Sequence, residues 1–111
     1  MIVLTCTCVP HPGRFEEARD AALDVTAASR AHAGLIGYFW NLDDAARELR
    51  LVEVHEDEAS VQNHIALTDL SRLAAAGSFR DIQVFGDPPS AELRATLEGF
   101  GDVRIYPAVG S

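Results

Sequence analysis

The spacing of apolar residues changes several times along the chain, and each change predicts a new element. Residues 2–9 are rich in β-branched residues and cysteine and run into Pro10, as a strand entering a turn does. From Gly13 to about His32 the apolar positions repeat at helical spacing, and Gly34 follows as a helix-ending residue. These features predict a first strand and a first helix.

Two further apolar runs lie in the middle of the chain. Residues 35–42 and 48–55 are bulky and nearly uninterrupted, and the short polar segment 43–47 between them predicts a hairpin. Asp57 is a good N-cap for a second helix, which the apolar spacing extends to Leu73.

The last third predicts a fourth strand at 79–86, a short helix capped by Ser90 or Asp87, and a fifth strand at 103–106. The order is βαββαβ followed by αβ. This order is typical of the ferredoxin-like α+β fold, an antiparallel sheet with both helices on one face. We therefore expect a single domain over residues 1–111, with a core at 1–86 and a C-terminal extension at 87–111.

A sheet with helices on one face leaves its other face open. Little of the 111 residues remains to cover that face, so we expect the same face of a second copy to cover it, as a homodimer. The extension is expected to reach over the partner subunit or to close one mouth of a pocket.

Composition excludes several partners and reactions. The chain is 48% hydrophobic and 23% charged, an ordinary globular balance, and its net charge of −8 disfavours nucleic acid and acidic membrane surfaces. All nine basic residues are arginine, so neither a Schiff-base lysine nor a phosphate-loop lysine is present. The N-terminal apolar run is too short and broken for a signal peptide or membrane span, which predicts a cytoplasmic protein.

Two segments of the chain form a recognisable pattern. The turn at Pro12 and Gly13 opens the first helix, and a Glu-Val strand end at Glu53 leads into a helix with an alanine and then a histidine, Ala59 and His64. These segments resemble the antibiotic biosynthesis monooxygenase family, and the resemblance covers residues 1 to about 86. The resemblance implies a dimeric α/β barrel. Members of this superfamily include cofactor-free oxygenases of phenols or quinols, haem-degrading enzymes and proteins without an assigned activity. Where the family usually has tryptophan at the third strand end, this chain has His55.

The third strand carries the first candidate pair. Its period of two places Leu49, Leu51, Glu53 and His55 on one face, which we expect to line the barrel interior between subunits. Glu53 can then orient His55 as a general base. Alternatively, His55 is a half-exposed strand-end residue, and Glu53 pairs with an arginine across the dimer.

Other candidates lie on the second helix and second strand. His64 shares a helical stripe with apolar residues, so it is predicted to point towards the sheet, either as a base, as a haem ligand or as a structural histidine. Tyr38, Phe39 and Trp40 offer aromatic walls for a flat ligand, and Asn41 offers an amide, although core packing and a turn role explain these residues equally well.

Cys6, Cys8 and His11 are too few ligands for a closed metal centre, so we expect buried thiols, no metal and no cofactor. Three functions remain as hypotheses. The first is a cofactor-independent monooxygenase for a small phenol or quinol, with His55 or His64 as the base. The second is a non-catalytic dimer that binds an apolar metabolite or acts in a stress response, and the third is haem binding through His64.

Overall fold

The computed structural model describes residues 1–110, and within them the chain forms five strands and four helices. In chain order these are β1 (Ile2–Pro10), α1 (Phe15–Ser29), β2 (Leu35–Asp43), β3 (Glu48–His55), α2 (Glu58–Leu67), α3 (Ser71–Ala76), β4 (Gly77–Gly86), α4 (Ala91–Glu98) and β5 (Val103–Pro107). Every predicted strand is present. The α+β class and the ferredoxin-like order are confirmed.

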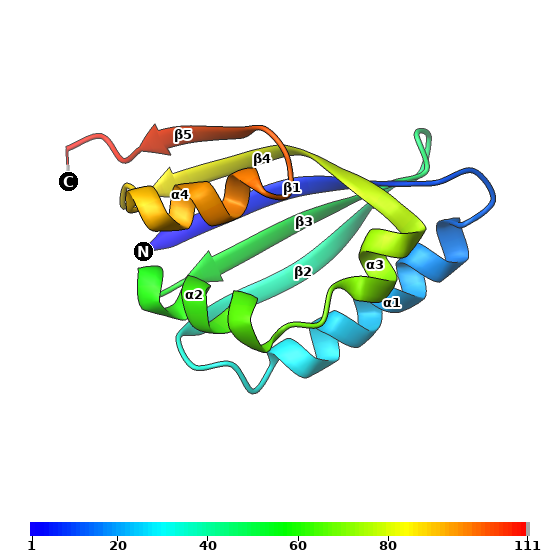
Figure 1. The fold of residues 1–111 in the computed structure, drawn as a ribbon, viewed down its shortest axis with the longest axis horizontal. Coiled ribbons are helices and arrows are strands. Elements are labelled where there is room, and N and C mark those ends of the chain that lie inside the picture. Colours follow the sequence, from blue (N-terminus) through cyan, green and yellow to red (C-terminus); the bar gives the residue numbers. More distant parts are fainter. Residues whose placement is uncertain (111) are drawn as a thin grey trace.

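One sheet contains all the described strands, in the order β2-β3-β1-β4-β5, and it is open rather than closed on itself (Figure 1). The four core strands pair antiparallel, as predicted. β5 instead runs parallel to β4, with Ile82 opposite Val103. A parallel partner needs a crossover connection, and α4 supplies it.

The helices cover one face of the sheet in two groups (Figure 1). Small residues of α1 pack with Leu49 of β3 and Leu73 of α3. At the other end, Val61 of α2 and Leu93 of α4 pack over strands β1 and β4. Each helix therefore buries its apolar side against the sheet, and within residues 1–110 no helix lies over the opposite sheet face.

The second predicted helix is wrong in its length, because it is two helices. Asp57 caps α2 as predicted, accepting from the Ser60 amide at 2.9 Å. The chain then becomes extended at Thr68, whose hydroxyl donates to the His64 carbonyl at 2.5 Å. Such a side-chain bond competes with the helical ladder, and Asp69 then accepts from the Ser71 amide to begin α3.

The C-terminal extension folds back over its own chain. Ser90, rather than Asp87, caps α4 by accepting from the Leu93 amide, and Glu58 of α2 accepts two hydrogen bonds from Ser90, at 2.7 and 2.6 Å. Asp87 instead pairs with the amino group of Met1. Of the two roles expected for the extension, its position against its own chain fits closure of a pocket.

No helix among residues 1–110 has the length and apolar character to cross a membrane.

Candidate functional site

A cavity of about 80 Å³ lies between the sheet and its own helices. Its floor follows from strand register. Tyr38 lies opposite Glu53, and Trp40 lies opposite Leu51, so the period of two turns these four side chains towards the helix layer. Leu4 and Cys6 of β1 continue the two rows. The floor is thus aromatic at its β2 edge and aliphatic towards β4.

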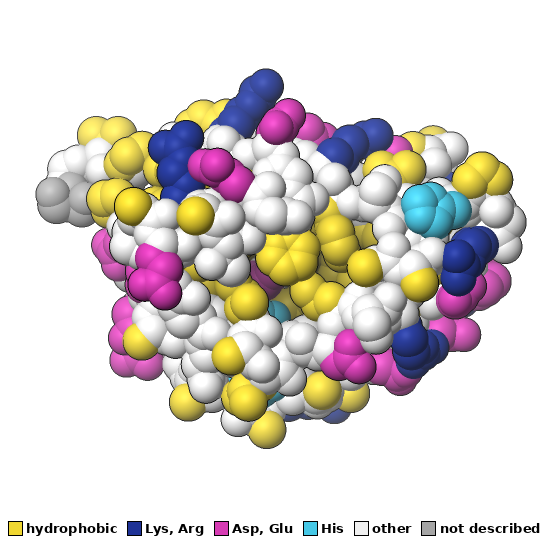
Figure 2. Space-filling model, viewed as in Figure 1, with side chains coloured by type: hydrophobic (Ala, Val, Ile, Leu, Met, Phe, Trp, Pro, Cys, Tyr) yellow, Lys and Arg dark blue, Asp and Glu magenta, His cyan; other side chains and the backbone are white. Residues whose placement is uncertain are grey.

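Side chains from α2, β4 and the extension form the rest of the wall: His64, Ile65, Thr68, Leu70, Phe79, Ile82, Leu97 and Phe100. Figure 2 shows hydrophobic atoms at the bottom of a hollow in the centre of the helix-bearing face. Because Leu97 and Phe100 belong to the C-terminal extension, this segment closes part of the cavity. The lining predicts a mainly apolar ligand.

The predicted position of the site between two subunits is wrong. Leu49 and Leu51 do share a face with Glu53 and His55, but that face meets the helices of the same chain. The reason is that the small residues of α1 and the polar residues of α2 complement this face directly. Strand alternation identifies which residues share a face, but it does not say which layer covers them.

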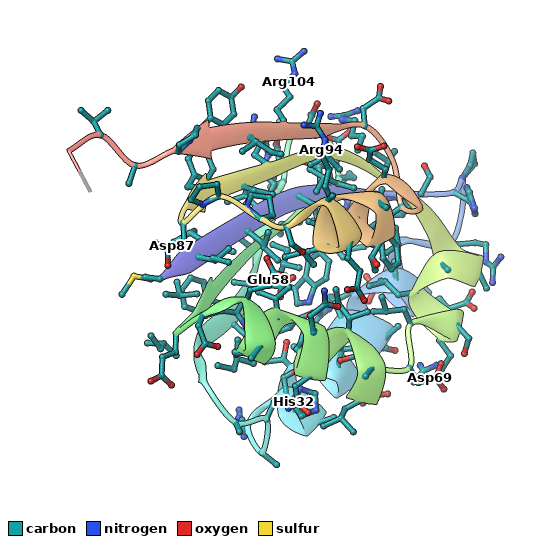
Figure 3. All side chains as sticks on the ribbon, turned by 60° about the vertical axis from the view of Figure 1, so that its left-hand side comes forward. His32, Glu58, Asp69, Asp87, Arg94 and Arg104 are labelled. Carbon is teal, nitrogen blue, oxygen red and sulfur yellow. The ribbon has the colours of Figure 1, made fainter. Side chains whose placement is uncertain are left out.

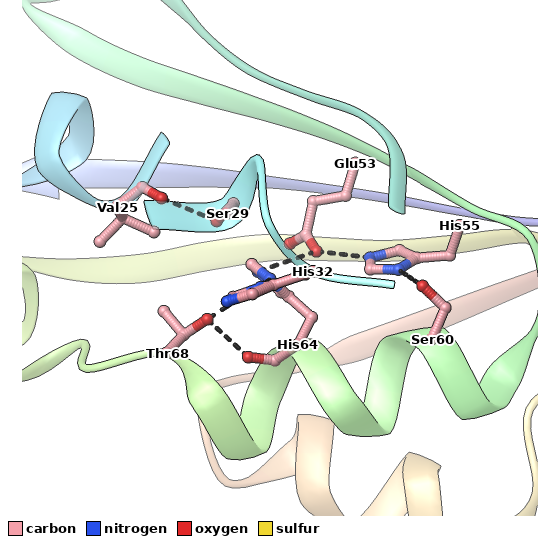
Figure 4. A network of polar contacts seen from close by, with 8 residues as sticks. All are labelled: Val25, Ser29, His32, Glu53, His55, Ser60, His64 and Thr68. Atoms are coloured by element: carbon pink, nitrogen blue, oxygen red, sulfur yellow. Dashed lines mark hydrogen bonds and ion pairs between the residues drawn. The ribbon is translucent and has the colours of Figure 1, made fainter. Parts of the chain in front are cut away.

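Polar side chains at one end of the cavity form a continuous network (Figure 4). His55 is fully buried, with Nδ1 2.8 Å from Ser60 Oγ and Nε2 2.8 Å from Glu53 Oε1. The same carboxylate oxygen lies 3.6 Å from His64 Nε2. On its far side, His64 Nδ1 lies 2.7 Å from His32 Nδ1. Glu53 therefore joins two imidazoles of the same chain.

The two histidines of α2 and β3 differ in access to the cavity. His64 lines the cavity, whereas His55 does not and is also not half-exposed, as one alternative predicted. His55 acts through its contacts with Glu53 and Ser60. The arrangement makes His64 the candidate base and His55 a positioning residue.

Burial determines the protonation of the cavity groups. The pKa of His64 is lowered because burial disfavours the imidazolium, and His32 and His55 add to this effect, while the Glu53 carboxylate opposes it. The pKa of Tyr38 is raised because burial and the Glu53 carboxylate disfavour the phenolate. His64 is thus a neutral acceptor near pH 7, and Tyr38 is a neutral donor.

His32 was not predicted as a site residue, because no local sequence pattern marks it. It lies in the turn between α1 and β2, where α1 ends earlier than predicted, and it is only partly buried. This turn is held against α2 at Gly34, whose φ of +78° favours glycine and where a Cβ would lie 2.7 Å from Ser60 Cβ. Only the tight approach of the turn to α2 brings His32 to His64. A glycine two residues after a histidine is too weak a signal to predict that contact.

Trp40 has an unused donor. Its Nε1 atom is buried and has no hydrogen-bond partner within residues 1–110. The indole N–H lies near the Tyr38 phenol and opposes the rise in the phenol pKa. The two groups nevertheless do not form a hydrogen bond of good geometry. A buried N–H without a partner is costly, so this atom is available to an oxygen of a ligand.

Two predicted binding residues lie elsewhere. Phe39 alternates with Tyr38 and Trp40 and is exposed on the open face of the sheet. Asn41 follows on that face and donates to the Arg50 carbonyl at 3.2 Å. Neither side chain lines the cavity, because only every second residue of β2 faces the helices.

Both thiols lie on β1, where Cys8 is buried and Cys6 is partly buried in the cavity floor. Burial raises the pKa of Cys6 to about 12 and that of Cys8 to about 11, so neither is a nucleophile at neutral pH. Within the described part of the chain, no group of three or more histidine, cysteine or acidic residues is arranged to hold a metal ion.

Comparison with known proteins identifies the family. The family model for antibiotic biosynthesis monooxygenase matches residues 1–76. The chain belongs to the antibiotic biosynthesis monooxygenase family. The match ends before β4, so α4 and β5 lie beyond the part that the family model describes. No curated protein matches the chain.

Several solved structures share the fold. Rv0793 from Mycobacterium tuberculosis is 16% identical, with a TM-score of 0.66 over 81% of this chain and 97% of its own. PA3566 from Pseudomonas aeruginosa is 24% identical, with a TM-score of 0.62 over 75% and 87%. MupZ from Pseudomonas fluorescens is 13% identical, with a TM-score of 0.74 over 99% and 91%. The MupZ alignment includes the extension, so this monooxygenase-family chain shares its full-length fold with at least one solved protein.

Proposed function

We propose that the protein is a cofactor-independent monooxygenase that acts on a small phenol or quinol. The observation that carries the proposal is the position of His64, a buried neutral imidazole in the wall of an apolar cavity, beside the Glu53 carboxylate. A base of this kind removes a phenolic proton, while Tyr38 and Trp40 hold the ring and the Trp40 N–H donates to a second oxygen.

The chemistry needs no external reductant. His64 takes the phenolic proton, and the electron-rich phenolate ring reduces dioxygen and forms a carbon–oxygen bond at a ring C–H position. Loss of water from the resulting hydroperoxide leaves a quinone, so a phenol plus one dioxygen gives a quinone plus one water. The substrate supplies all four electrons, and Glu53 stabilises the imidazolium that forms at His64.

Oxygen consumption over a panel of small phenols and quinols tests this function. We expect turnover of at least one of them, with formation of the quinone seen in its absorbance. His64→Gln is expected to lower kcat by about 10²- to 10⁴-fold, the usual contribution of a general base. His11→Gln is the matched control, because His11 is an exposed histidine away from the cavity. Equal rates for His64→Gln and the unmodified protein would contradict the role of His64.

A second function is supported by the cavity lining. Most of its side chains are aliphatic or aromatic, which suits binding of an apolar metabolite without reaction. His55 in place of the family tryptophan favours this alternative. A thermal-shift screen separates the two functions: a ligand that raises Tm strongly but is never oxidised supports binding alone.

Haem does not fit the observed site. Cavities for ligands of this size span roughly 300–1,000 Å³, several times the volume found here. We therefore assign no haem-linked step to this chain.

We also propose a homodimer, formed through the open sheet face. Val54, Val3, Phe85 and Tyr106 lie side by side in register across four strands of that face. Phe85 stacks on Tyr106 at 5.3 Å between ring centroids, and both rings stay partly exposed. A contiguous apolar row on an uncovered sheet is typical of an interface, and a second copy related by a two-fold axis presents the same row.

A further inference from the structure

We propose that His32 is the outlet of a proton relay that carries a proton from the cavity through His64 to solvent. The proposal rests on the proposed function, since it concerns a proton that the cavity base accepts. It assigns a role to a residue that touches neither the cavity nor a ligand.

The relay is inferred from the geometry of the contact between His64 and His32. His64 Nδ1 and His32 Nδ1 are 2.7 Å apart, which requires one nitrogen to carry the proton and the other to accept it. The ring centroids are 4.9 Å apart with an angle of 61° between the planes, so the rings meet at their edges rather than stacking. Thr68 Oγ1 is more distant from the same nitrogen, at 3.4 Å, and its hydroxyl already donates to the His64 carbonyl. His32 is therefore the main partner of His64 Nδ1.

The two histidines differ in exposure in the way a relay requires. His64 is 5% exposed and lines the cavity through the side that carries Nε2. His32 is partly exposed, and Figure 3 shows it at the periphery of the molecule, below α2. Water reaches His32 without entering the cavity, so a proton leaves the site without opening the apolar wall.

The proton balance has three parts. A ligand hydroxyl gives its proton to His64 Nε2, His64 gives its Nδ1 proton to His32 Nδ1, and His32 releases its Nε2 proton to water. One proton leaves, and each ring is then neutral in its other tautomer. Protonation of the reduced oxygen draws one proton back along the same path, which restores both tautomers and agrees with an overall reaction that releases no proton. The imidazolium at His64 exists only between these transfers, which suits a buried ring.

Charged and titratable groups around His64 support proton transfer from His64 to His32. Glu53 and His55 face it from β3, Tyr38 faces it from β2, and His32 faces it from the turn before β2. Glu53 is the one carboxylate among these groups, and it stabilises the proton when it is first accepted. Tyr38 stays protonated and does not compete for it. The remaining titratable acceptor with access to water is His32.

The first experiment measures proton exchange and does not depend on turnover. In protein labelled with ¹⁵N-histidine, NMR gives the exchange rate of the His64 Nδ1 proton with water. His32→Asn is the informative variant, because its amide lies near the position of Nδ1 and keeps a hydrogen bond to His64 but does not pass a proton on. The relay predicts slower exchange in His32→Asn, by about 10-fold or more. A purely structural contact predicts equal or faster exchange, and that result would overturn the proposal.

The second experiment measures kinetics with a quinol that the protein oxidises. His32→Ala is expected to lower kcat by about 10-fold in dilute buffer, with little change in KM, and added imidazole is expected to restore the rate. His11→Ala is the matched control and should respond to neither change. A lowered kcat that imidazole does not restore would contradict the relay. If no quinol is oxidised by the unmodified protein, the proposed function fails, while the exchange rates still decide the relay.

Discussion

Glu53 Oε1 lies 2.8 Å from His55 Nε2, in a contact between two residues on one face of β3. His55 is fully buried, and its other nitrogen meets Ser60 at the start of α2. His55 therefore connects β3 to α2 and holds the Glu53 carboxylate in the position that faces His64. This contact makes the site dependent on a residue that does not line the cavity.

The first prediction concerns His55. His55→Ala removes two hydrogen bonds and leaves a cavity beside a carboxylate, so it is expected to lower the free energy of unfolding by about 3 kcal/mol. Chemical denaturation measures the change. His11→Ala, at an exposed histidine, is the control and should change stability by less than about 0.5 kcal/mol. Similar small effects for both variants would show that His55 does not hold α2 in place.

The pH dependence of stability follows from His64. Burial lowers the pKa of His64 below its ordinary value of 6.5. Between the lowered pKa and 6.5 the unfolded chain binds more protons than the folded chain, so the free energy of unfolding rises with pH in that window. His64 therefore destabilises the fold below the window and has no such effect above it.

We expect the protein to lose stability as the pH falls below about 6.5, and His64→Gln to lose less over the same range. Urea denaturation at several pH values measures both slopes. His11→Gln should keep the slope of the unmodified protein. A slope that is the same with and without His64 would mean that this residue keeps its ordinary pKa in the fold.

Much of the fold was accessible from the sequence because periodicity and turn residues are local signals. Asp57 was predicted to cap α2 and does so. The break at Thr68 was missed, since it depends on a hydroxyl that bonds to a carbonyl of its own helix. His32 was missed for a related reason: its role comes from a turn packed against a distant helix. The face of β3 was predicted correctly, but its covering layer required knowledge of how α1 and α2 pack.

The extension provides a third prediction. Leu93 of α4 is fully buried in the cluster that includes Leu4 and Val84. Leu93→Ala is expected to cost about 2–5 kcal/mol of stability, the usual range for a buried leucine. Arg94→Ala, next on the same helix and paired only with exposed Glu98, is expected to cost less than about 0.5 kcal/mol. A small effect of Leu93→Ala would indicate that α4 does not stay docked in solution.

The last prediction tests the homodimer. Phe85→Glu places a charge within the apolar row on the open face, where the proposed interface would bury it. Analytical ultracentrifugation at micromolar concentration is expected to show a dimer for the unmodified protein and a monomer for Phe85→Glu. Leu67→Glu is the matched control, because Leu67 is an equally apolar and more exposed residue on α2, on the helix-bearing side. It should remain a dimer. A monomeric unmodified protein would contradict the proposed interface, yet it would leave the cavity site intact, because every residue of that site comes from one chain.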